Sequence, residues 1–318
     1  MRFPMSLAAR VFALTVAVSG MAAVGGQEQA HADNTLVTVH SAAMNRDIPV
    51  RILKAAGAGP APTLYLLDGL RAPDNNNGWL INTDVVNFFA NKHVNVAIPF
   101  GGGGTFYSDW VNDDPKLGHV RWETFLTREL PNVMRSKFGS DGVNNAIAGL
   151  SMSGTSALSL AERHPGLYKA VVSLSGYPTA MAPAFAQGIQ VSVAQMGGDS
   201  NNMWGAWPSS EWVQHDPLVN AHKLHGTKVY ISAGTGLPGA ADGAVNPLDP
   251  KFDPVRFIQL VPLETMAGLS TLPFALAAMS SGADTKVHLN ETGIHWWNHW
   301  QNRLHEAWYE TIKPAIGG

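Results

Sequence analysis

Short apolar runs alternate along the chain with longer segments in which apolar residues recur at helical spacing. The runs are almost continuously apolar, which is typical of strands buried on both faces of a sheet. We expect strands at residues 63–67, 94–100, 145–150, 170–174, 229–233 and 286–289. We expect helices between them, at residues 78–91, 122–138, 152–164 and 296–312. This alternation predicts an α/β fold, with a mostly parallel central sheet flanked by helices on both faces.

Two segments, residues 177–225 and 234–284, interrupt the alternation and are rich in Gly and Pro. We interpret them as irregular insertions that cap the sheet and help to shape a pocket. The apolar window 269–278 is short and contains Pro273, so we expect no membrane-spanning segment after residue 32. No internal repeat or linker divides the rest of the chain, and we expect a single domain over residues 33–318.

The first 32 residues have the pattern of a secretory signal peptide. Arg2 and Arg10 are followed by an apolar run over residues 11–24, and Ala30-His31-Ala32 supplies a small-x-small cleavage motif. The apolar run is shorter than the roughly 20 residues that a membrane-spanning helix needs. We therefore expect cleavage after Ala32 and export of a mature chain without a transmembrane segment.

Composition excludes several classes of protein and site. The 318 residues are 45% hydrophobic and 14% charged, as in an ordinary globular protein. The net charge is −3, and removal of residues 1–32 takes away two Arg and one Glu and leaves −4. This acidic balance argues against a nucleic-acid partner. Because the chain has no Cys, it has no disulfide, no thiolate nucleophile and no Cys-ligated metal.

The sharpest local motif lies at residues 146–154, Ala-Ile-Ala-Gly-Leu-Ser-Met-Ser-Gly. An apolar strand enters a Gly-x-Ser turn and a helix follows at once, which is the context of a nucleophile elbow. In such a turn Ser151 is raised above the sheet, and Gly149 allows strand and helix to pass closely. Ser153 stands where the pattern usually has its second Gly. The alternative is a tight strand-to-helix turn in which Ser151 only caps the helix.

A serine nucleophile needs a histidine base, and in the order Ser–acid–His the histidine follows the last strand. His288 lies inside a predicted strand and is expected to be a packed residue. His295 follows a Gly-containing loop and opens a helix, so we expect it to face Ser151. His299 is expected to pack among tryptophans on the helix. Two His four residues apart could bind zinc, but Trp296 stands where a zincin needs Glu, so we expect no metal.

The third member must be a carboxylate between the serine and the histidine, and spacing alone does not choose among candidates. The candidates are Asp242, Asp249, Asp253, Glu264 and Asp284. An oxyanion hole would take the amide of Met152 and that of Leu70, which follows an early strand. The run Gly101–Gly104 lacks the Lys-Ser/Thr of a phosphate loop, and we interpret it as a flexible loop at the ligand-binding edge of the sheet.

Several motifs resemble one family in particular. In chain order they are residues 66–72, 77–83, 106–110, 122–127, 149–153, 203–205 and 215–218. Together they closely resemble the trehalose mycolyltransferases, the antigen eighty-five family of mycolic-acid bacteria, which are esterase D-like α/β-hydrolases. The likeness extends from about Met44 to Pro314. It implies an α/β-hydrolase catalytic domain over residues 33–318 that works without a cofactor.

The resemblance also implies a function. Members of this family are secreted acyltransferases that move a mycoloyl group between trehalose mono- and diesters, or onto cell-wall arabinogalactan. By matching positions, Ser151 is the nucleophile and His295 the base, and Glu264, which follows a Leu, is the acid. The oxyanion hole and headgroup site are carried over in the same way. Leu70 and Met152 match the oxyanion-hole amides, and Asp68, Arg71 and Trp297 match residues that bind the trehalose headgroup.

The chain departs from the family pattern in three places. Residues 234–260 match poorly, the cysteine pair of some members is absent, and residues 263–279 are more apolar than expected. That apolar segment either lines an acyl groove or packs in the core. Two other functions stay open beside acyl transfer. The chain could be a secreted carboxylesterase with the same triad, or a wall- or matrix-binding member with a weak triad.

Overall fold

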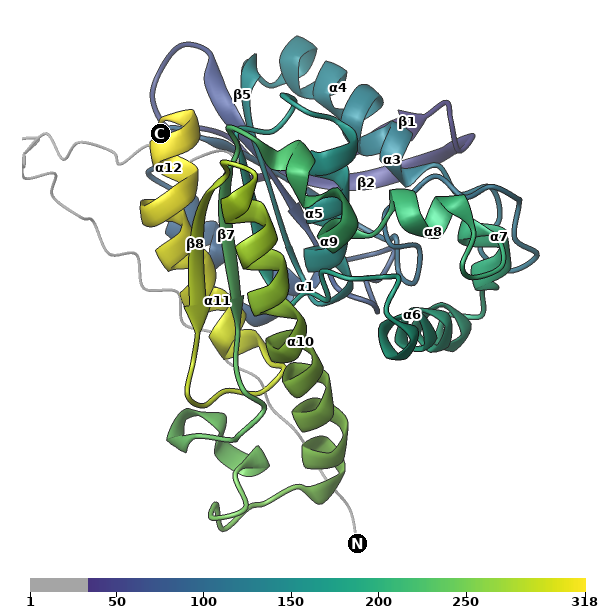
Figure 1. Ribbon diagram of the computed structural model, residues 1–318. Coiled ribbons are helices and arrows are strands. Elements are labelled where there is room, and N and C mark those ends of the chain that lie inside the picture. The colour runs from purple at the N-terminus through teal and green to yellow at the C-terminus, as the bar shows by residue number, and fades with distance from the viewer. Residues whose placement is uncertain (1–33) are drawn as a thin grey trace, which may run out of the picture. The chain divides into compact units, whose positions relative to one another are not determined.

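The computed structural model describes residues 34–318, which contain one eight-stranded sheet (Figure 1). The predicted signal peptide, residues 1–32, lies outside the described residues. The strand order is β1-β2-β4-β3-β5-β6-β7-β8; strands β3 to β8 run parallel, and β1 and β2 run antiparallel to their neighbours. The bounds are β1 Asn34–Ser41, β2 Arg46–Leu53, β3 Ala61–Leu67, β4 Asn95–Pro99, β5 Ser140–Leu150, β6 Ala170–Leu174, β7 Lys228–Ala233 and β8 Asp284–Leu289.

The six predicted strands are confirmed as β3 to β8, and with them the mostly parallel α/β sheet. The hairpin of β1 and β2 was not predicted. These two strands lie at one edge of the sheet, where buried and exposed residues alternate, so they lack the continuous apolar run that marks the inner strands.

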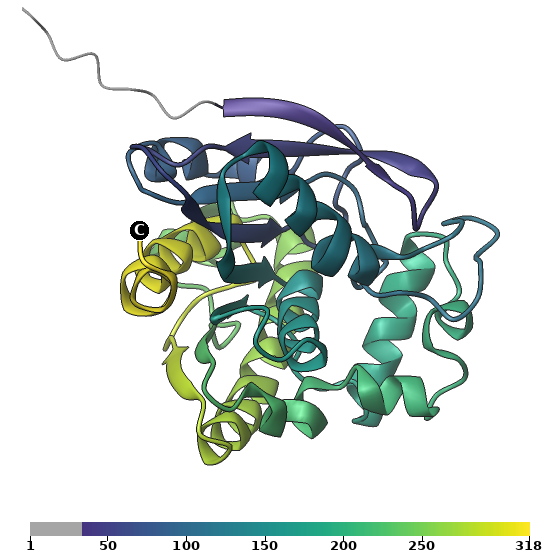
Figure 2. The ribbon, with the colours of Figure 1, turned by 90° about the horizontal axis from the view of Figure 1, so that it is seen from above.

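Helices cover both faces of the sheet (Figures 1 and 2). Side chains alternate along each inner strand, so Tyr65 and Leu67 of β3 point to one face while Leu64 and Leu66 point to the other. The first face carries α3 (Trp122–Thr124), η1 (Phe125–Glu129), α4 (Leu130–Lys137), α5 (Met152–Arg163) and α10 (Pro254–Ser280). The second carries α1 (Gly78–Asn82), α2 (Val85–Phe89), α11 (Trp297–Ala307), η4 (Trp308–Ile312) and α12 (Lys313–Ile316).

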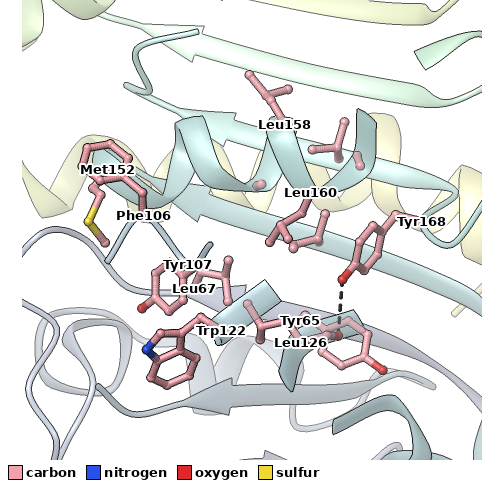
Figure 3. Packing of buried hydrophobic residues seen from close by; sticks show 14 of the residues in the cluster. Tyr65, Leu67, Phe106, Tyr107, Trp122, Leu126, Met152, Leu158, Leu160 and Tyr168 are labelled. Atoms are coloured by element: carbon pink, nitrogen blue, oxygen red, sulfur yellow. Dashed lines mark hydrogen bonds between the residues drawn. The ribbon is translucent and has the colours of Figure 1, made fainter. Parts of the chain in front are cut away.

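The core of the first face is aromatic where β3 meets the helices (Figure 3). The rings of Tyr65 and Tyr168 meet edge to face with centroids 6.0 Å apart. The Tyr168 hydroxyl donates a hydrogen bond to the carbonyl of Leu126 at 3.5 Å. Because Tyr65, Leu126 and Tyr168 come from separate segments, this packing ties strand β3 to the helical layer that carries the site.

The predicted helices at 122–138, 152–164 and 296–312 are confirmed, the first and last with a π-helical turn inside them. The predicted helix at 78–91 is two short helices, α1 and α2. The reason is local: Thr83 is extended, with φ −135° and ψ 169°, and its hydroxyl accepts a hydrogen bond from the Val85 amide at 3.3 Å. A side chain that bonds its own backbone in this way competes with helix continuation.

The two segments expected to be irregular are largely helical, so that prediction was wrong. Residues 177–225 contain α6 (Pro183–Gln195), α7 (Ser200–Trp204), α8 (Ser210–Gln214), α9 (Pro217–Asn220) and η2 (Ala221–Leu224). Residues 234–284 contain η3 (Ala240–Val245) and the 27-residue helix α10. Asp253 caps α10 through the amides of Val255 and Arg256, and Pro254 takes the first turn, where its missing N–H costs nothing.

Helix α10 continues through two prolines, contrary to the expectation that Pro273 would keep the apolar window short. Pro262 and Pro273 both lie on the exposed side, where water can hydrate the carbonyls they leave unpaired. Among the described helices, α10 is the one whose length and composition would allow it to cross a membrane. Its other side packs against β7 and β8 through residues such as Phe274 and Ala278.

Candidate active site

The turn between β5 and α5 is a nucleophile elbow in its backbone geometry. Ser151 has φ 54° and ψ −124°, a region that costs a non-glycine residue about 1–3 kcal/mol. The turn is tight: a side chain at Gly149 would overlap the carbonyl of Ser153, and one at Gly154 would lie 3.0 Å from the Gly176 backbone. Small residues are therefore required at these positions for the serine to stand above the sheet.

Ser153 explains why the pattern lacks its second glycine. Its side chain is fully buried, and its hydroxyl lies 2.9 Å from the Leu150 amide and 3.1 Å from the Leu67 carbonyl. The hydroxyl accepts from the first group and donates to the second. A serine at this position therefore joins the start of α5 to the ends of β5 and β3, which a glycine could not do.

Three side chains from separate segments form a hydrogen-bonded chain. The hydroxyl of Ser151 lies 2.8 Å from Nε2 of His295. Nδ1 of the same ring lies 2.8 Å from Oε2 of Glu264, which projects from α10. His295 is 4% exposed and Glu264 1% exposed, so water screens the interaction between them poorly. The arrangement suits activation of a serine nucleophile for attack on an acyl carbonyl.

The second oxygen of Glu264 has its own partners, which sequence reasoning missed. Oε1 accepts from the Ser175 hydroxyl at 2.8 Å and from the Gly234 amide at 2.5 Å. Burial alone would raise the pKa of Glu264, but the hydrogen bond and charge of His295, together with these two donors, outweigh it and hold the pKa below its usual value. Ser175 and Gly234 directly follow β6 and β7, so the rule that ligands and active sites gather at the carboxyl edge of a parallel sheet could have found them.

The other four candidate acids have different partners. Asp253 caps α10, Asp284 pairs with Lys228 at 2.5 Å, and Asp249 accepts from the Lys251 amide. Asp242 lies 2.5 Å from Nε2 of His299. Of the five carboxylates that the sequence left open, the structure therefore brings only Glu264 to His295.

The remaining two histidines have structural partners. His299, expected to pack among tryptophans, fastens α11 to η3 through its contact with Asp242. His288 stacks on Tyr230, with centroids 4.8 Å apart, and its Nε2 lies 2.9 Å from Glu310. His288, Glu306 and Glu310 are close enough to one another to hold a metal ion. However, the Arg303 guanidinium already donates a hydrogen bond to Glu306 and supplies positive charge there.

The loop after β3 passes directly beside the serine. A side chain at Gly69 would lie 3.8 Å from the β-carbon of Ser151. The Leu70 carbonyl accepts from the Gly104 amide at 3.0 Å, so the glycine run expected to be a flexible loop packs against this segment. Met152 opens α5, where unpaired backbone amides carry partial positive charge.

Asp68 and Trp297, two of the three residues predicted to bind the trehalose headgroup, both lie against Gly78. Asp68 is 4% exposed and accepts from the amides of Gly69, at 2.7 Å, and Gly78, at 2.5 Å. Burial raises the pKa of Asp68, and these two amide hydrogen bonds oppose the rise. A side chain at Gly78 would overlap the ring of Trp297 and lie 2.8 Å from Asp68. Arg71 is exposed, three residues further along the loop.

Comparison with known proteins gives a consistent result. Residues 41–311 match the family described as putative esterase. Diacylglycerol acyltransferase/mycolyltransferase Ag85A of Mycobacterium tuberculosis is 34% identical over 322 residues, covering 98% of this chain and 89% of the relative. Ag85B of Mycobacterium avium, described by the same activity, is 34% identical over 292 residues, covering 88% and 81%.

Solved structures show the same fold. MPT51 (FbpC1) of Mycobacterium tuberculosis superposes with a TM-score of 0.75 at 28% identity, covering 90% of this chain and 99% of that one. An S-formylglutathione hydrolase from Agrobacterium tumefaciens superposes with a TM-score of 0.64 at 15% identity, covering 89% and 95%. The second match bears on the fold alone, and both agree with the predicted α/β-hydrolase fold.

Proposed function

Because this chain belongs to the diacylglycerol acyltransferase/mycolyltransferase Ag85 family and is an acyltransferase, we propose the following reaction for it. It is a secreted serine acyltransferase that moves a long, mycoloyl-type acyl group between trehalose esters or onto sugar hydroxyls of cell-wall arabinogalactan. The observation that carries the proposal is the pair of 2.8 Å contacts that link Ser151, His295 and Glu264.

In the first half-reaction, Oγ of Ser151 attacks the ester carbonyl of the donor while Nε2 of His295 accepts its proton. Glu264, kept ionised by its buried donors, holds the imidazole tautomer and stabilises the imidazolium. The amides of Leu70 and Met152 stabilise the oxyanion. The imidazolium then gives its proton to the departing sugar oxygen, and the acyl group is left on the serine.

In the second half-reaction, a sugar hydroxyl gives its proton to His295 and attacks the acyl-serine, which restores the free enzyme. Transfer exceeds hydrolysis only if the acceptor sugar is held in place and water is excluded. Trp297 would stack on a sugar face, and Arg71 would donate hydrogen bonds from its exposed guanidinium. Asp68 would accept a hydroxyl through the lone pairs that its two amide partners leave free.

A secreted carboxylesterase with the same three residues is the second candidate, favoured by the match of residues 41–311 to the putative esterases. A third candidate, a wall- or matrix-binding protein with a weak triad, would lack an activated serine. The three candidate functions differ in the final acceptor of the acyl group, which is a sugar or water, and in whether Ser151 is reactive.

The test is to incubate the enzyme with a trehalose monoester radiolabelled in its acyl chain, with and without free trehalose. We expect label in the trehalose diester, and none of it with Ser151→Ala. Label found solely in free fatty acid would replace the transferase with the esterase. A fluorophosphonate that fails to label folded wild-type protein would favour the binding protein and refute both enzymes.

A further inference from the structure

Helix α10 exposes a regular line of apolar residues on the side opposite the sheet. From Val255 to Met279, eight of the exposed positions recur at alternating intervals of three and four residues, and seven of the eight are apolar. We name these positions the α10 stripe; they are Val255, Ile258, Pro262, Thr265, Leu269, Leu272, Leu276 and Met279. Ile258 is 71% exposed, Leu269 66% and Leu276 58%. Packing in the core, one of the two alternatives raised for residues 263–279, does not account for these exposed side chains.

The spacing of the stripe is that of a helix–helix seam. An interval of 3.5 residues is the heptad repeat, and the eight stripe residues occupy every a and d position from 255 to 279. A helix about 40 Å long presents the seam, and in both views it lies at the outside of the fold (Figures 1 and 2). A regular seam of this length fits a second helix better than it fits a small ligand.

Helix α10 itself carries no exposed charge along most of the stripe. Between Phe257 and Ala283 the one ionisable residue is Glu264, whose side chain points the other way, to His295. Exposed helix faces in soluble proteins usually carry charged residues, whereas the centres of protein interfaces are depleted of them. The composition of this face is therefore that of an interface and not of a solvated surface.

We propose that a second copy of this chain packs on the stripe, helix α10 against helix α10, antiparallel across a two-fold axis. The stripe is complementary to itself in that arrangement. Its midpoint lies between Thr265 and Leu269, so Val255 of one copy meets Met279 of the other. The antiparallel direction also separates the like-charged ends of the two helices and pairs their dipoles favourably.

The area available fits the core of a dimer interface. At about 100 Å² for each fully exposed aliphatic side chain, one stripe exposes on the order of 400 Å² of apolar surface. That value is comparable with the largest apolar patch of an ordinary monomer. Two stripes would bury about 800 Å² together as the centre of an interface, and the exposed flanking residues Gln259 and Pro273, at e positions, would extend it toward the usual size of about 1,600 Å².

A lipid surface is the competing occupant, and the helix fits it less well. Helices that lie on membranes carry a Lys- and Arg-rich polar face beside a broad apolar one. Within α10 the one basic residue is Arg256, at the first turn, which stacks over Trp296 and pairs with Asp253. The exposed residues beside the stripe, Gln259, Leu263 and Pro273, are uncharged, so the helix supplies no basic flank along its length.

The first test is the oligomeric state in solution, measured by sedimentation velocity from about 0.1 to 100 μM protein. Wild type is expected to dimerise, and the double variant Leu269→Glu/Leu272→Glu is expected to weaken the dimer at least about 100-fold. The control is Val143→Glu, an apolar residue on β5 that is similarly exposed but lies far from the stripe in sequence and sheet position. Circular dichroism and fluorophosphonate labelling check that each variant is folded.

The second test fixes the direction of the helices and uses the absence of native Cys. A short bismaleimide should join two copies of Thr265→Cys/Leu269→Cys, because these positions face each other at the midpoint. It should not join copies of Val255→Cys/Ile258→Cys, whose partners would lie about 30 Å apart in the antiparallel pair.

Two results would overturn the proposal. One is a wild-type protein that stays monomeric at every concentration tested. The other is a monomer that sediments with phosphatidylglycerol–phosphatidylcholine vesicles and loses that binding with Leu269→Glu/Leu272→Glu, which would assign the stripe to a lipid surface. Cross-linking of the 255/258 pair would replace the antiparallel dimer with a parallel one.

Discussion

Replacement of Ser175 by Ala tests whether the buried donors around Glu264 set the protonation of the proposed acid. The Ser175 hydroxyl donates to Glu264 at 2.8 Å and accepts from Nε1 of Trp300 at 3.0 Å. The carboxylate would keep the Gly234 amide and His295 but lose one of its donors. A hydrogen bond to a charged group contributes about 1.5–3 kcal/mol.

The expected result is a fall in kcat/KM of about tenfold at neutral pH, which corresponds to about 1.4 kcal/mol. The fall should grow in acid. Glu264 has its pKa held below the usual value, and removal of a donor raises that pKa, so the ionised form is lost at a higher pH. Acyl transfer from a trehalose monoester should be measured from about pH 4 to pH 8, and the loss should be larger at pH 5 than at pH 7.

Two controls separate this effect from others. Ser173→Ala removes another buried hydroxyl, one without a hydrogen-bond partner and two residues away on β6, and should leave the pH profile unchanged. Trp300→Phe removes the second partner of Ser175 but keeps its bond to Glu264, so it should affect stability more than the acid limb. An equal loss at every pH in Ser175→Ala, or no loss, would refute the reasoning.

Three further predictions concern the site and its support. In Gly149→Ala the new methyl group would overlap the Ser153 carbonyl, so fluorophosphonate labelling of Ser151 should fall at least about 100-fold. Labelling of this variant at the wild-type level would refute the steric argument. In Gly78→Ala the methyl would displace Trp297, so the KM for the trehalose acceptor should rise several-fold with serine labelling retained; an unchanged KM would remove Trp297 from the acceptor site. Burial raises the pKa of Glu123, but the hydrogen bond from His164, the nearby His215 ring 3.8 Å away, and the hydrogen bonds and charge of Arg163 outweigh it and lower the pKa well below 4.5. The ionised Glu123 therefore contributes its full stabilisation above pH 4.5, and this stabilisation is lost as the pH falls toward the lowered pKa of the folded state. Glu123→Gln should lower the free energy of unfolding, measured in urea melts, by about 3 kcal/mol at pH 7 and by less at pH 3. An equal loss at both pH values would contradict this pH dependence.

The parts of the fold that could be predicted from sequence are those with strong local signals. The inner strands are continuous apolar runs, and the elbow at Ser151 needs small neighbours within a few residues of it. The hairpin of β1 and β2 could not be predicted in this way, because these strands at the edge of the sheet are half exposed and lack a continuous apolar run. Helix α10 was not predicted because proline usually breaks a helix. Pro262 and Pro273 are tolerated because both lie on the exposed side, where an unpaired carbonyl can be hydrated.

The site itself could be predicted only in part. The serine and histidine lie at the ends of recognisable elements, so position in the chain was informative. The carboxylate that meets His295 lies on a helix whose course depends on tertiary packing, and spacing left five candidates open. Family resemblance pointed to Glu264. Ser175 and Gly234 bond to that carboxylate across 89 and 30 residues of sequence, a separation that no local pattern records.

The position of Glu264 on α10 makes the proposed triad depend on the packing of one peripheral helix. Ser151 and His295 sit on turns anchored in the sheet, whereas α10 contacts the sheet through its last two strands, β7 and β8. A partial opening that releases α10 would part the carboxylate from the imidazole and leave the rest of the sheet folded. Loss of activity would then measure the free energy of that local opening. A contact that holds α10 in place would raise the denaturant concentration at which activity is lost.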